Sequence, residues 1–353
     1  MKNPVNIAKK SYSEILRIND LSQQIDHINL KLKNLDKLNN SVEQINNNLL
    51  QRIDKLEQNL SNLNEQNQYL KDLIIANVDI KNVPKATGNM RLAQLANFKL
   101  LLIVKKICEK HNLEYYLNFG SLLGAVRHQG YIPWDDDIDI MMIREDYNKL
   151  LKVLDKEFAR TKLFYTHSEI IRIYYDKTPI QIDIFPSDFY QRPVKDEKDR
   201  TKIGQKLINI HNSNIVFDWE KLKTQERTII NLTYPEIEKL RQKSIGPDIS
   251  KAQASKTHPA IFHGIEKSSI RPLRSVQDYD WIYPLKKANF EGIKMPIPNQ
   301  PDPILRHYYH DYMTWPLNIK PKHNDIQSRL NDTTIQTIQL IADDKINMLE
   351  RIK

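Results

Sequence analysis

The first eighty residues show one repeating pattern of apolar positions. From Leu21 to Ile74, apolar residues recur at alternating steps of four and three, which is the heptad repeat of a coiled coil. Every d position is apolar, and only asparagine interrupts the a positions. The d positions are Leu21, Ile28, Leu35, Val42, Leu49, Leu56, Leu63 and Leu70, and the a positions are Ile25, Leu32, Asn39, Asn46, Ile53, Leu60, Asn67 and Ile74.

This repeat predicts a coiled-coil oligomerisation stalk over residues 1–78. Asparagine at a fixes the register and favours two parallel strands, so we expect a homo-oligomer, in the first place a parallel homodimer. The rod would be roughly 80 Å long at 1.5 Å per residue. A single amphipathic helix folded back on the rest of the chain is the alternative. Residues 79–90 lose the heptad and contain Pro84 and Gly88, which indicates a linker.

The remainder of the chain alternates between helical and strand patterns. Residues 91–112 have a strongly apolar helical face, and residues 114–119 alternate as a strand does. A short helix is expected after Gly120 and Ser121, then a strand from Asp137, and later a hairpin that pairs residues 170–176 with the strand around Asp183. We therefore expect an α/β (α+β) core with a small mixed sheet. Lysine-rich helical stretches predict a helical insertion at about residues 191–260.

Glycine is concentrated at one point of the chain. Only 8 residues of 353 are glycine, yet Gly120, Gly124 and Gly130 fall within one short segment. Free backbone N–H groups at the start of a helix after Gly120 and Ser121 would bind an anion. Gly120 would let a phosphate approach, and Ser121 could donate a hydrogen bond to it. No Gly-Lys-Ser/Thr follows, so this is not a Walker loop.

Aspartates interrupt the apolar strand that follows. Alternation puts Asp137 and Asp139 on one face, roughly 6.5–7 Å apart along the strand. Such carboxylates can hold Mg²⁺, and they would be costly to bury without an ion. Asp183, between two isoleucines, is the third carboxylate that we expect from a neighbouring strand. An EF-hand loop is the first alternative, but its sixth position would be Ile140 instead of glycine. A solvated acidic turn, the second, does not explain Asp139 between two isoleucines.

The charge lies outside the heptad region. Residues 1–80 hold 10 basic and 10 acidic residues, so the remainder, with 43 basic and 34 acidic, carries the whole net charge of +9. A basic region suits an anionic ligand, for which phosphates, a nucleotide, a phospholipid surface or nucleic acid are the candidates. A merely soluble basic protein is the alternative. The single cysteine, Cys108, excludes an intramolecular disulfide. With no apolar run of roughly 20 residues and no apolar signal segment, we expect a cytoplasmic protein.

A glycine–serine turn, a short helix, an Asp-Ile-Asp strand and a later single Asp together resemble the nucleotidyltransferase superfamily. Three longer stretches resemble the LicD/fukutin-type phosphotransferase family more specifically: GSLLGAVRHQGYIPWDDDIDIMMIREDY, QIDIFPSD and FEGIKMPIPNQPDPILRHYYHDYMTWP. The resemblance covers about residues 91–190 and 262–320. One departure is that the family usually has glycine where His310 follows Tyr309.

The resemblance implies a LicD-like phosphotransferase domain at residues 91–353, with a nucleotidyltransferase-like core. Members transfer a phospho-alcohol, such as phosphocholine or a phospho-alditol, from a CDP-linked donor to a sugar hydroxyl of a surface glycan, such as a capsule or lipooligosaccharide, and release CMP. The cofactor would be Mg²⁺, with Mn²⁺ as the alternative ion.

Roles carry over residue by residue from the matching motifs. Asp137, Asp139 and Asp183 would be catalytic and would hold the metal, with Asp183 also the candidate general base. Gly120 and Ser121 would bind donor phosphate. Arg127 is either a pyrophosphate contact or part of a surface ion pair.

The expected partners and the rival functions draw on this resemblance and on the rest of the sequence. We expect a CDP-linked donor, a glycan acceptor and peripheral contact with the inner face of a membrane, and we do not expect nucleic acid as a partner. One alternative is a nucleotidyltransferase that moves NMP onto a small molecule or RNA. Another is a coiled-coil scaffold with an inactive domain. Aromatic residues of the C-terminal block, such as Tyr308 and Tyr312, suggest either a choline cage or ordinary core packing.

Overall fold

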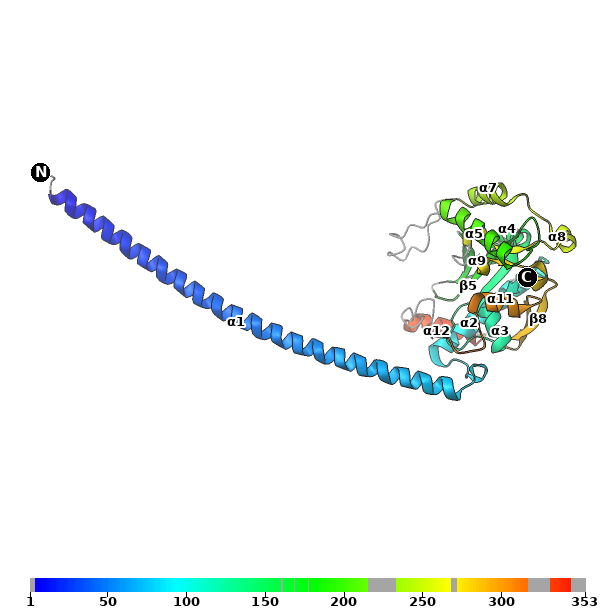
Figure 1. Cartoon of the computed structure of the whole chain (residues 1–353), viewed down its shortest axis with the longest axis horizontal. Helices are drawn as coiled ribbons and strands as arrows, with labels where there is room; N and C mark the ends of the chain where they lie inside the picture. Colours follow the sequence, from blue (N-terminus) through cyan, green and yellow to red (C-terminus); the bar gives the residue numbers. More distant parts are fainter. Residues whose placement is uncertain are drawn as a thin grey trace. The chain divides into compact units, whose positions relative to one another are not determined.

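A computed structural model describes residues 4–159, 161–167, 169–176, 178–214, 233–267, 272–316 and 331–343, with side chains from residue 17 onward. The chain divides into two units, Met1–Asn77 and Val78–Lys353. The first unit contains one continuous helix, α1 (Pro4–Asn77), as the heptad pattern predicts (Figure 1).

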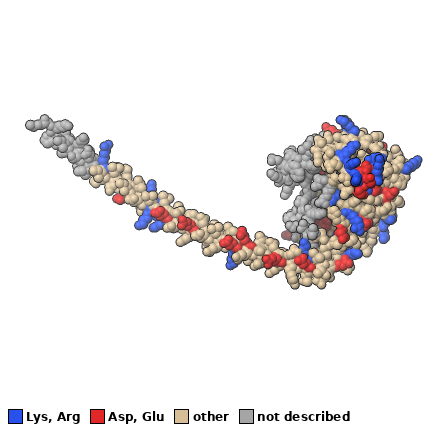
Figure 2. Space-filling model, in the orientation of Figure 1, with Lys and Arg blue, Asp and Glu red and all other residues tan. Residues whose placement is uncertain are grey.

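The apolar side chains of α1 are exposed along its whole described length. At the a and d positions their exposed fractions run from 45% for Val42 to 66% for Leu56. Figure 2 shows charged side chains of both signs scattered along this helix, with uncharged surface between them. Helix formation is thus confirmed, whereas pairing into a coiled coil stays a prediction. Within the described part of the chain, no helix combines the length and the apolar character needed to cross a bilayer.

The second unit is built on a mixed sheet, which confirms the expected α/β class. The order β1-β2-β5-β4-β3 forms its main path, and β6 pairs with β5 and with β7. Among the strand pairs that the described residues form in this sheet, only β2 and β5 are parallel and the others are antiparallel. The strands are β1 (Tyr116–Leu117), β2 (Asp139–Ile143), β3 (Leu163–His167), β4 (Ile171–Tyr175), β5 (Gln181–Phe189), β6 (Ile261–His263) and β7 (Val276–Gln277), with a separate hairpin of β8 (Lys286–Phe290) and β9 (Ile293–Ile297).

Helices surround this sheet and close its core. In the second unit α11 packs against α3, α12 against α2, and α5 against α9 (Figure 1). Buried Leu, Ile and aromatic side chains of α2, α4 and the strands form one continuous core. The helices are α2 (Gly88–Lys110), α3 (Phe119–Arg127), α4 (Arg144–Phe158), α5 (Glu197–Asn214), α7 (Tyr234–Ile245), α8 (Lys251–Thr257), α9 (Pro272–Ser275), α10 (Tyr279–Ile282), α11 (Pro301–Tyr309) and α12 (Asp332–Ala342), with 3-10 turns η1 (Ile80–Asn82) and η2 (Ile265–Lys267).

The described part of the predicted insertion at 191–260 is largely helical. It contains α5, α7 and α8. A buried charged network joins it to the core: Arg144 bonds Asp188 through Nη2 at 2.7 Å and Glu266 through Nη1 at 2.7 Å, while Arg241 of α7 lies 3.4 Å from Asp188. Burial lowers the pKa of Arg144, but the two carboxylates outweigh it and raise that pKa well above its usual value. The insertion is therefore anchored beside β5.

The segment expected to be a linker is packed onto the second unit. Ile80 is only 2% exposed, and α2 begins at Gly88 instead of residue 91. Lys85 donates to Glu291 at 2.8 Å, and Arg91 donates to the same carboxylate at 2.7 Å. Composition alone identified the break in the heptad, but it could not show that these residues find partners far along the chain.

Glu291 should make folding stability sensitive to acid. Burial raises the pKa of Glu291, but hydrogen bonds from Arg91 and Lys85 outweigh it and hold that pKa at about 2, against 4.5 for the free side chain. A depressed pKa means that the stabilisation is present above pH 4.5 and is lost as the pH falls toward 2. Glu291→Gln should lower the free energy of unfolding at pH 7 by roughly 2 kcal/mol and flatten its acid dependence. Urea denaturation at several pH values measures both effects.

Glu109→Gln is the matched control, because that side chain is 64% exposed. It should leave the free energy of unfolding and its pH profile close to those of the wild type. An unchanged acid slope in Glu291→Gln would contradict the prediction.

Candidate metal and phosphate site

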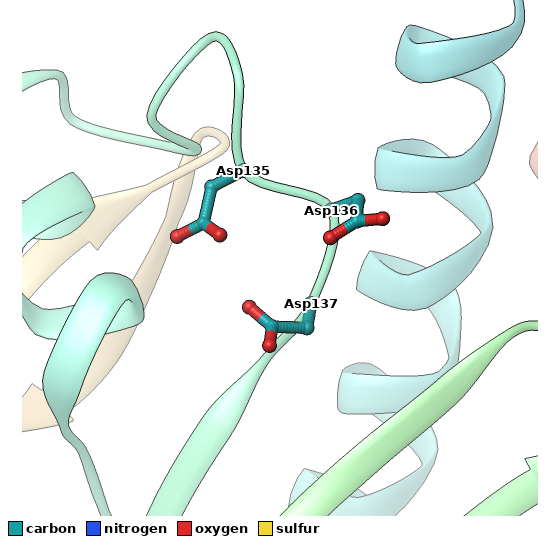
Figure 3. Close-up of side chains that lie close together, drawn as sticks. All are labelled: Asp135, Asp136 and Asp137. Carbon is teal, nitrogen blue, oxygen red and sulfur yellow. The ribbon is translucent and has the colours of Figure 1, made fainter. Parts of the chain in front are cut away.

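Three consecutive aspartates before β2 form an acidic loop, residues 135–137. One carboxylate oxygen of each lies within 4.8 Å of the others. Figure 3 shows Asp135 and Asp137 directed to the same side of the loop and Asp136 directed toward the neighbouring helix. Asp136 is 4% exposed, and the other two are half-buried. Carboxylate oxygens are the ligands that Mg²⁺ prefers, so the donor set fits a hard divalent cation.

Two buried amides of α2 hold the acidic loop through its backbone. Gln94 Nε2 donates to the carbonyl oxygen of Asp135 at 2.8 Å, and Asn97 Nδ2 donates to that of Asp136 at 2.7 Å. Asn97 Oδ1 also accepts the backbone N–H of Gln181 at 2.8 Å. Asn97 thus links the acidic loop to β5. Sequence reasoning missed both residues; the available signal was two amides among the apolar positions of 91–112.

The register of the sheet puts two predicted residues side by side. Asp139 and Asp183 are partners across the parallel pair of β2 and β5, so both side chains project from the same face. The expectation that Asp183 lies on a strand next to Asp139 is confirmed. Asp183 also forms an ion pair with Arg172 of β4 at 3.2 Å, which the sequence did not suggest. Asp137 lies in the acidic loop, two residues before Asp139, and the metal role of all three aspartates stays a prediction.

Gly120 and Ser121 lie within the first turn of α3, and not in a turn before it as we expected. Ser121 Oγ accepts the backbone N–H of Asp139 at 2.9 Å, which fixes the start of β2. A Cβ at Gly120 would overlap Oδ2 of Asp135. The glycine is therefore explained by the close approach of a site carboxylate. Donor phosphate binding by this turn remains a prediction.

Arg127 has a packing role. Its Nη1 donates to the carbonyl oxygen of Tyr312, and its Nε donates to His128 at 2.9 Å. The residue is 8% exposed, and burial lowers the pKa of Arg127 to about 10. These contacts join α3 to the segment after α11. Arg127 is therefore not part of the surface ion pair that we considered, and its contact with donor pyrophosphate stays a prediction.

The C-terminal aromatic block packs into the core beside the site. The Tyr308 hydroxyl has three polar partners: Asn118 at 3.1 Å, Gln277 at 2.6 Å and His263 at 3.0 Å. Its ring lies 5.1 Å from that of Phe119, centre to centre. This arrangement favours core packing over a choline cage for these residues.

Tyr309, which the sequence suggested only as an aromatic residue of a choline cage or of the core, is under the electrostatic influence of the site aspartates. Burial first, and then the nearby charges of Asp135 and Asp139, hold the pKa of the Tyr309 phenol well above its usual value. The hydroxyl stays protonated at neutral pH. It is therefore a neutral group that feels the charge of the aspartates.

Comparison with known proteins shows that the part of the chain around this site resembles a known family. Residues 112–235 match the family described as LicD/FKTN/FKRP, nucleotidyltransferase domain. The central part of this chain therefore resembles the LicD family. The matched residues include α3, the acidic loop, β2 and β5, so the acidic loop and both register partners lie within the region of similarity.

Individual proteins show the same similarity. The lipopolysaccharide cholinephosphotransferase LicD of Haemophilus influenzae is 26% identical over 263 residues, which is 67% of this chain and 96% of that protein. The mouse ribitol 5-phosphate transferase FKRP is 48% identical over 40 residues, 11% of this chain and 8% of its own length. An uncharacterized protein of Rickettsia prowazekii is 43% identical over 60 residues, 17% of this chain and 23% of its own.

His310, where the LicD-like pattern usually has glycine, keeps a glycine-like backbone. Its φ of 59° and ψ of −118° end α11 in a region that side chains disfavour. Such a conformation costs about 1–3 kcal/mol, so His310→Gly should raise the free energy of unfolding by roughly 1 kcal/mol after the entropy of glycine is subtracted. His307→Gly, within the helix, should lower it. Equal destabilisation by both in urea would contradict this.

A pair of glycine variants separates site geometry from folding. A Cβ at Gly120 would meet a movable carboxylate, whereas a Cβ at Gly124 would meet the backbone oxygen of Gly130. Gly120→Ala should weaken Mn²⁺ binding with little change in melting temperature. Gly124→Ala should lower stability by roughly 1–3 kcal/mol, although alanine favours helix. Calorimetric titration and thermal unfolding test both, and Mn²⁺ affinity unaltered in Gly120→Ala would count against the site.

Proposed function

We propose that this chain is a Mg²⁺-dependent phosphotransferase that moves a phospho-alcohol from a CDP-linked donor to a sugar hydroxyl of a surface glycan and releases CMP. The observation that carries the proposal is the LicD-family match across the acidic loop, β2 and β5. Relatives named for transfer of cholinephosphate and of ribitol 5-phosphate support the reaction class. They leave phosphocholine and a phospho-alditol as the candidate groups.

Asp137 is the aspartate on which the metal assignment rests. It belongs to the acidic loop, and it also belongs to the set Asp137, Asp139 and Asp183 that the family motif implies. Mg²⁺, or Mn²⁺ in its place, would neutralise donor phosphates and stabilise the charge that develops on them. The protein's own contribution is to hold the carboxylates in place, through Asn97 for the acidic loop and Arg172 for Asp183.

The proposed transfer exchanges one phosphorus–oxygen bond for another. The acceptor oxygen bonds the phosphorus that carries the alcohol, the bond from that phosphorus to CMP breaks, and Asp183 accepts the hydroxyl proton as general base. The excess of basic residues outside the heptad region favours an anionic donor. A second candidate, nucleotidyl transfer, is favoured by the domain's description; it would join NMP to the acceptor and release pyrophosphate.

CMP release tests the proposal. The full chain would be incubated with Mg²⁺, a glycan extract and CDP-choline, CDP-ethanolamine, CDP-glycerol or CDP-ribitol. We expect CMP from one donor, no CMP after chelation with EDTA, and a loss of at least about 100-fold in Asp137→Asn. Asp54→Asn, the same change on an exposed position of α1, is the control and should retain full activity.

Other results of this assay would point to a different site or a different function. Full activity in Asp137→Asn would overturn the site assignment. Pyrophosphate release from an NTP, with NMP joined to the acceptor, would favour the nucleotidyltransferase. Absence of any Mg²⁺-dependent nucleotide binding would favour the scaffold with an inactive domain.

A further inference from the structure

The first unit presents a long apolar face that is exposed. On α1, the a and d side chains from Leu21 to Ile74 lie on one stripe, and all of their apolar members are at least 45% exposed. Ile18, one heptad before Ile25, extends the stripe and is 64% exposed. A continuous stripe of this length is the feature of a helix that pairs with another helix.

We propose that α1 pairs with α1 of a second copy of this chain as a parallel, in-register, two-stranded coiled coil. Composition at the seam favours two strands: six of the eight d positions are leucine, and the apolar a positions include Ile25, Ile53 and Ile74. Isoleucine at a with leucine at d is the combination that selects a dimer.

The three asparagines on the seam fix the register. In a parallel, in-register pair, Asn39, Asn46 and Asn67 each face the same residue of the second copy and can hydrogen-bond with it. In an antiparallel pair, a positions pack against d positions, which here are all apolar. Each asparagine would then be buried against Leu, Ile or Val without a partner, which costs free energy at every such layer.

Charges beside the seam favour the same arrangement. In a parallel coil, a g residue meets the e residue five positions later on the other helix. Lys31 at g then meets Asp36 at e, and Arg52 meets Glu57. In the same way Ile45 meets an apolar residue, Leu50. An antiparallel coil pairs g with g, and the charged g positions within the heptads, Lys31 and Arg52, are both basic. Only the parallel register makes these neighbours complementary.

Disulfide trapping in the full chain tests orientation and register. Leu21→Cys puts a thiol at a d position near one end of the stripe, and the proposed dimer brings the two copies of it face to face. We expect oxidation to give nearly complete dimer on a non-reducing gel. The native Cys108 is 1% exposed, and burial raises the pKa of its thiol well above its usual value, so it should not compete.

Gln23→Cys, at an outward-facing f position, is the matched control and should give little crosslinked product. Sedimentation equilibrium of the wild-type chain should give twice the chain mass of 41.7 kDa. A monomer, the mass of three chains, or a dimer in which Leu21→Cys does not crosslink would each overturn the proposal. In an antiparallel dimer the two thiols would be roughly 80 Å apart.

A charge reversal keeps the proposal testable if the cysteine variant disturbs packing. Lys31→Glu with Arg52→Glu should raise the dimer dissociation constant by roughly tenfold, because four attractive pairs per dimer become repulsive. Mixing it with Asp36→Lys and Glu57→Lys should restore pairing as a heterodimer, seen by native mass spectrometry. Wild-type affinity in the Lys31→Glu, Arg52→Glu variant would overturn the predicted register.

Discussion

The parallel pairing of β2 with β5 is the constraint on which the candidate site depends. It puts Asp139 beside Asp183 and continues through five register pairs to Ile143 and Ser187. Side chains alternate between the two faces of a strand, so a slip of one residue would replace Asp183 by a buried isoleucine, Ile182 or Ile184. Asp139 and Asp183 are each flanked by two fully buried isoleucines, which is what keeps the two carboxylates on one face.

When the acidic loop is buried beside this sheet, its backbone polar groups need hydrogen-bond partners. Asn97 provides a partner on each side, because its Nδ2 donates to the acidic loop and its Oδ1 accepts from β5. It is 1% exposed, and a buried amide that completes its hydrogen bonds holds its neighbours in a unique arrangement. The arrangement of α2 against the sheet is therefore coupled to the geometry of the aspartates.

The sequence patterns predicted the features that depend on interactions between residues close together in the chain. The heptads predicted the helix α1, and a turn signal predicted the hairpin of β4 and β5, whose antiparallel pairing the structure confirms. Alternation predicted β2, although the strand begins at Asp139 and not at Asp137. The sequence did not show that α3 begins at Phe119, ahead of Gly120, or that Arg172 pairs with Asp183. These features depend on contacts between segments that are distant along the chain or on neighbouring strands, where a pattern in one segment carries no information about its partner.

Asparagine in apolar surroundings has a comparable physical effect in both units. Burying the Asn97 amide costs free energy, but its hydrogen bonds fix the connection between two segments. In the proposed coiled coil, burying Asn39, Asn46 and Asn67 would carry a similar cost and would fix the register. Leucine at any of these sites would bury more apolar surface, yet it would remove the difference in free energy between the intended arrangement and its alternatives. Stability in this chain comes from its aliphatic side chains, whereas the amides select which of several apolar packings is adopted.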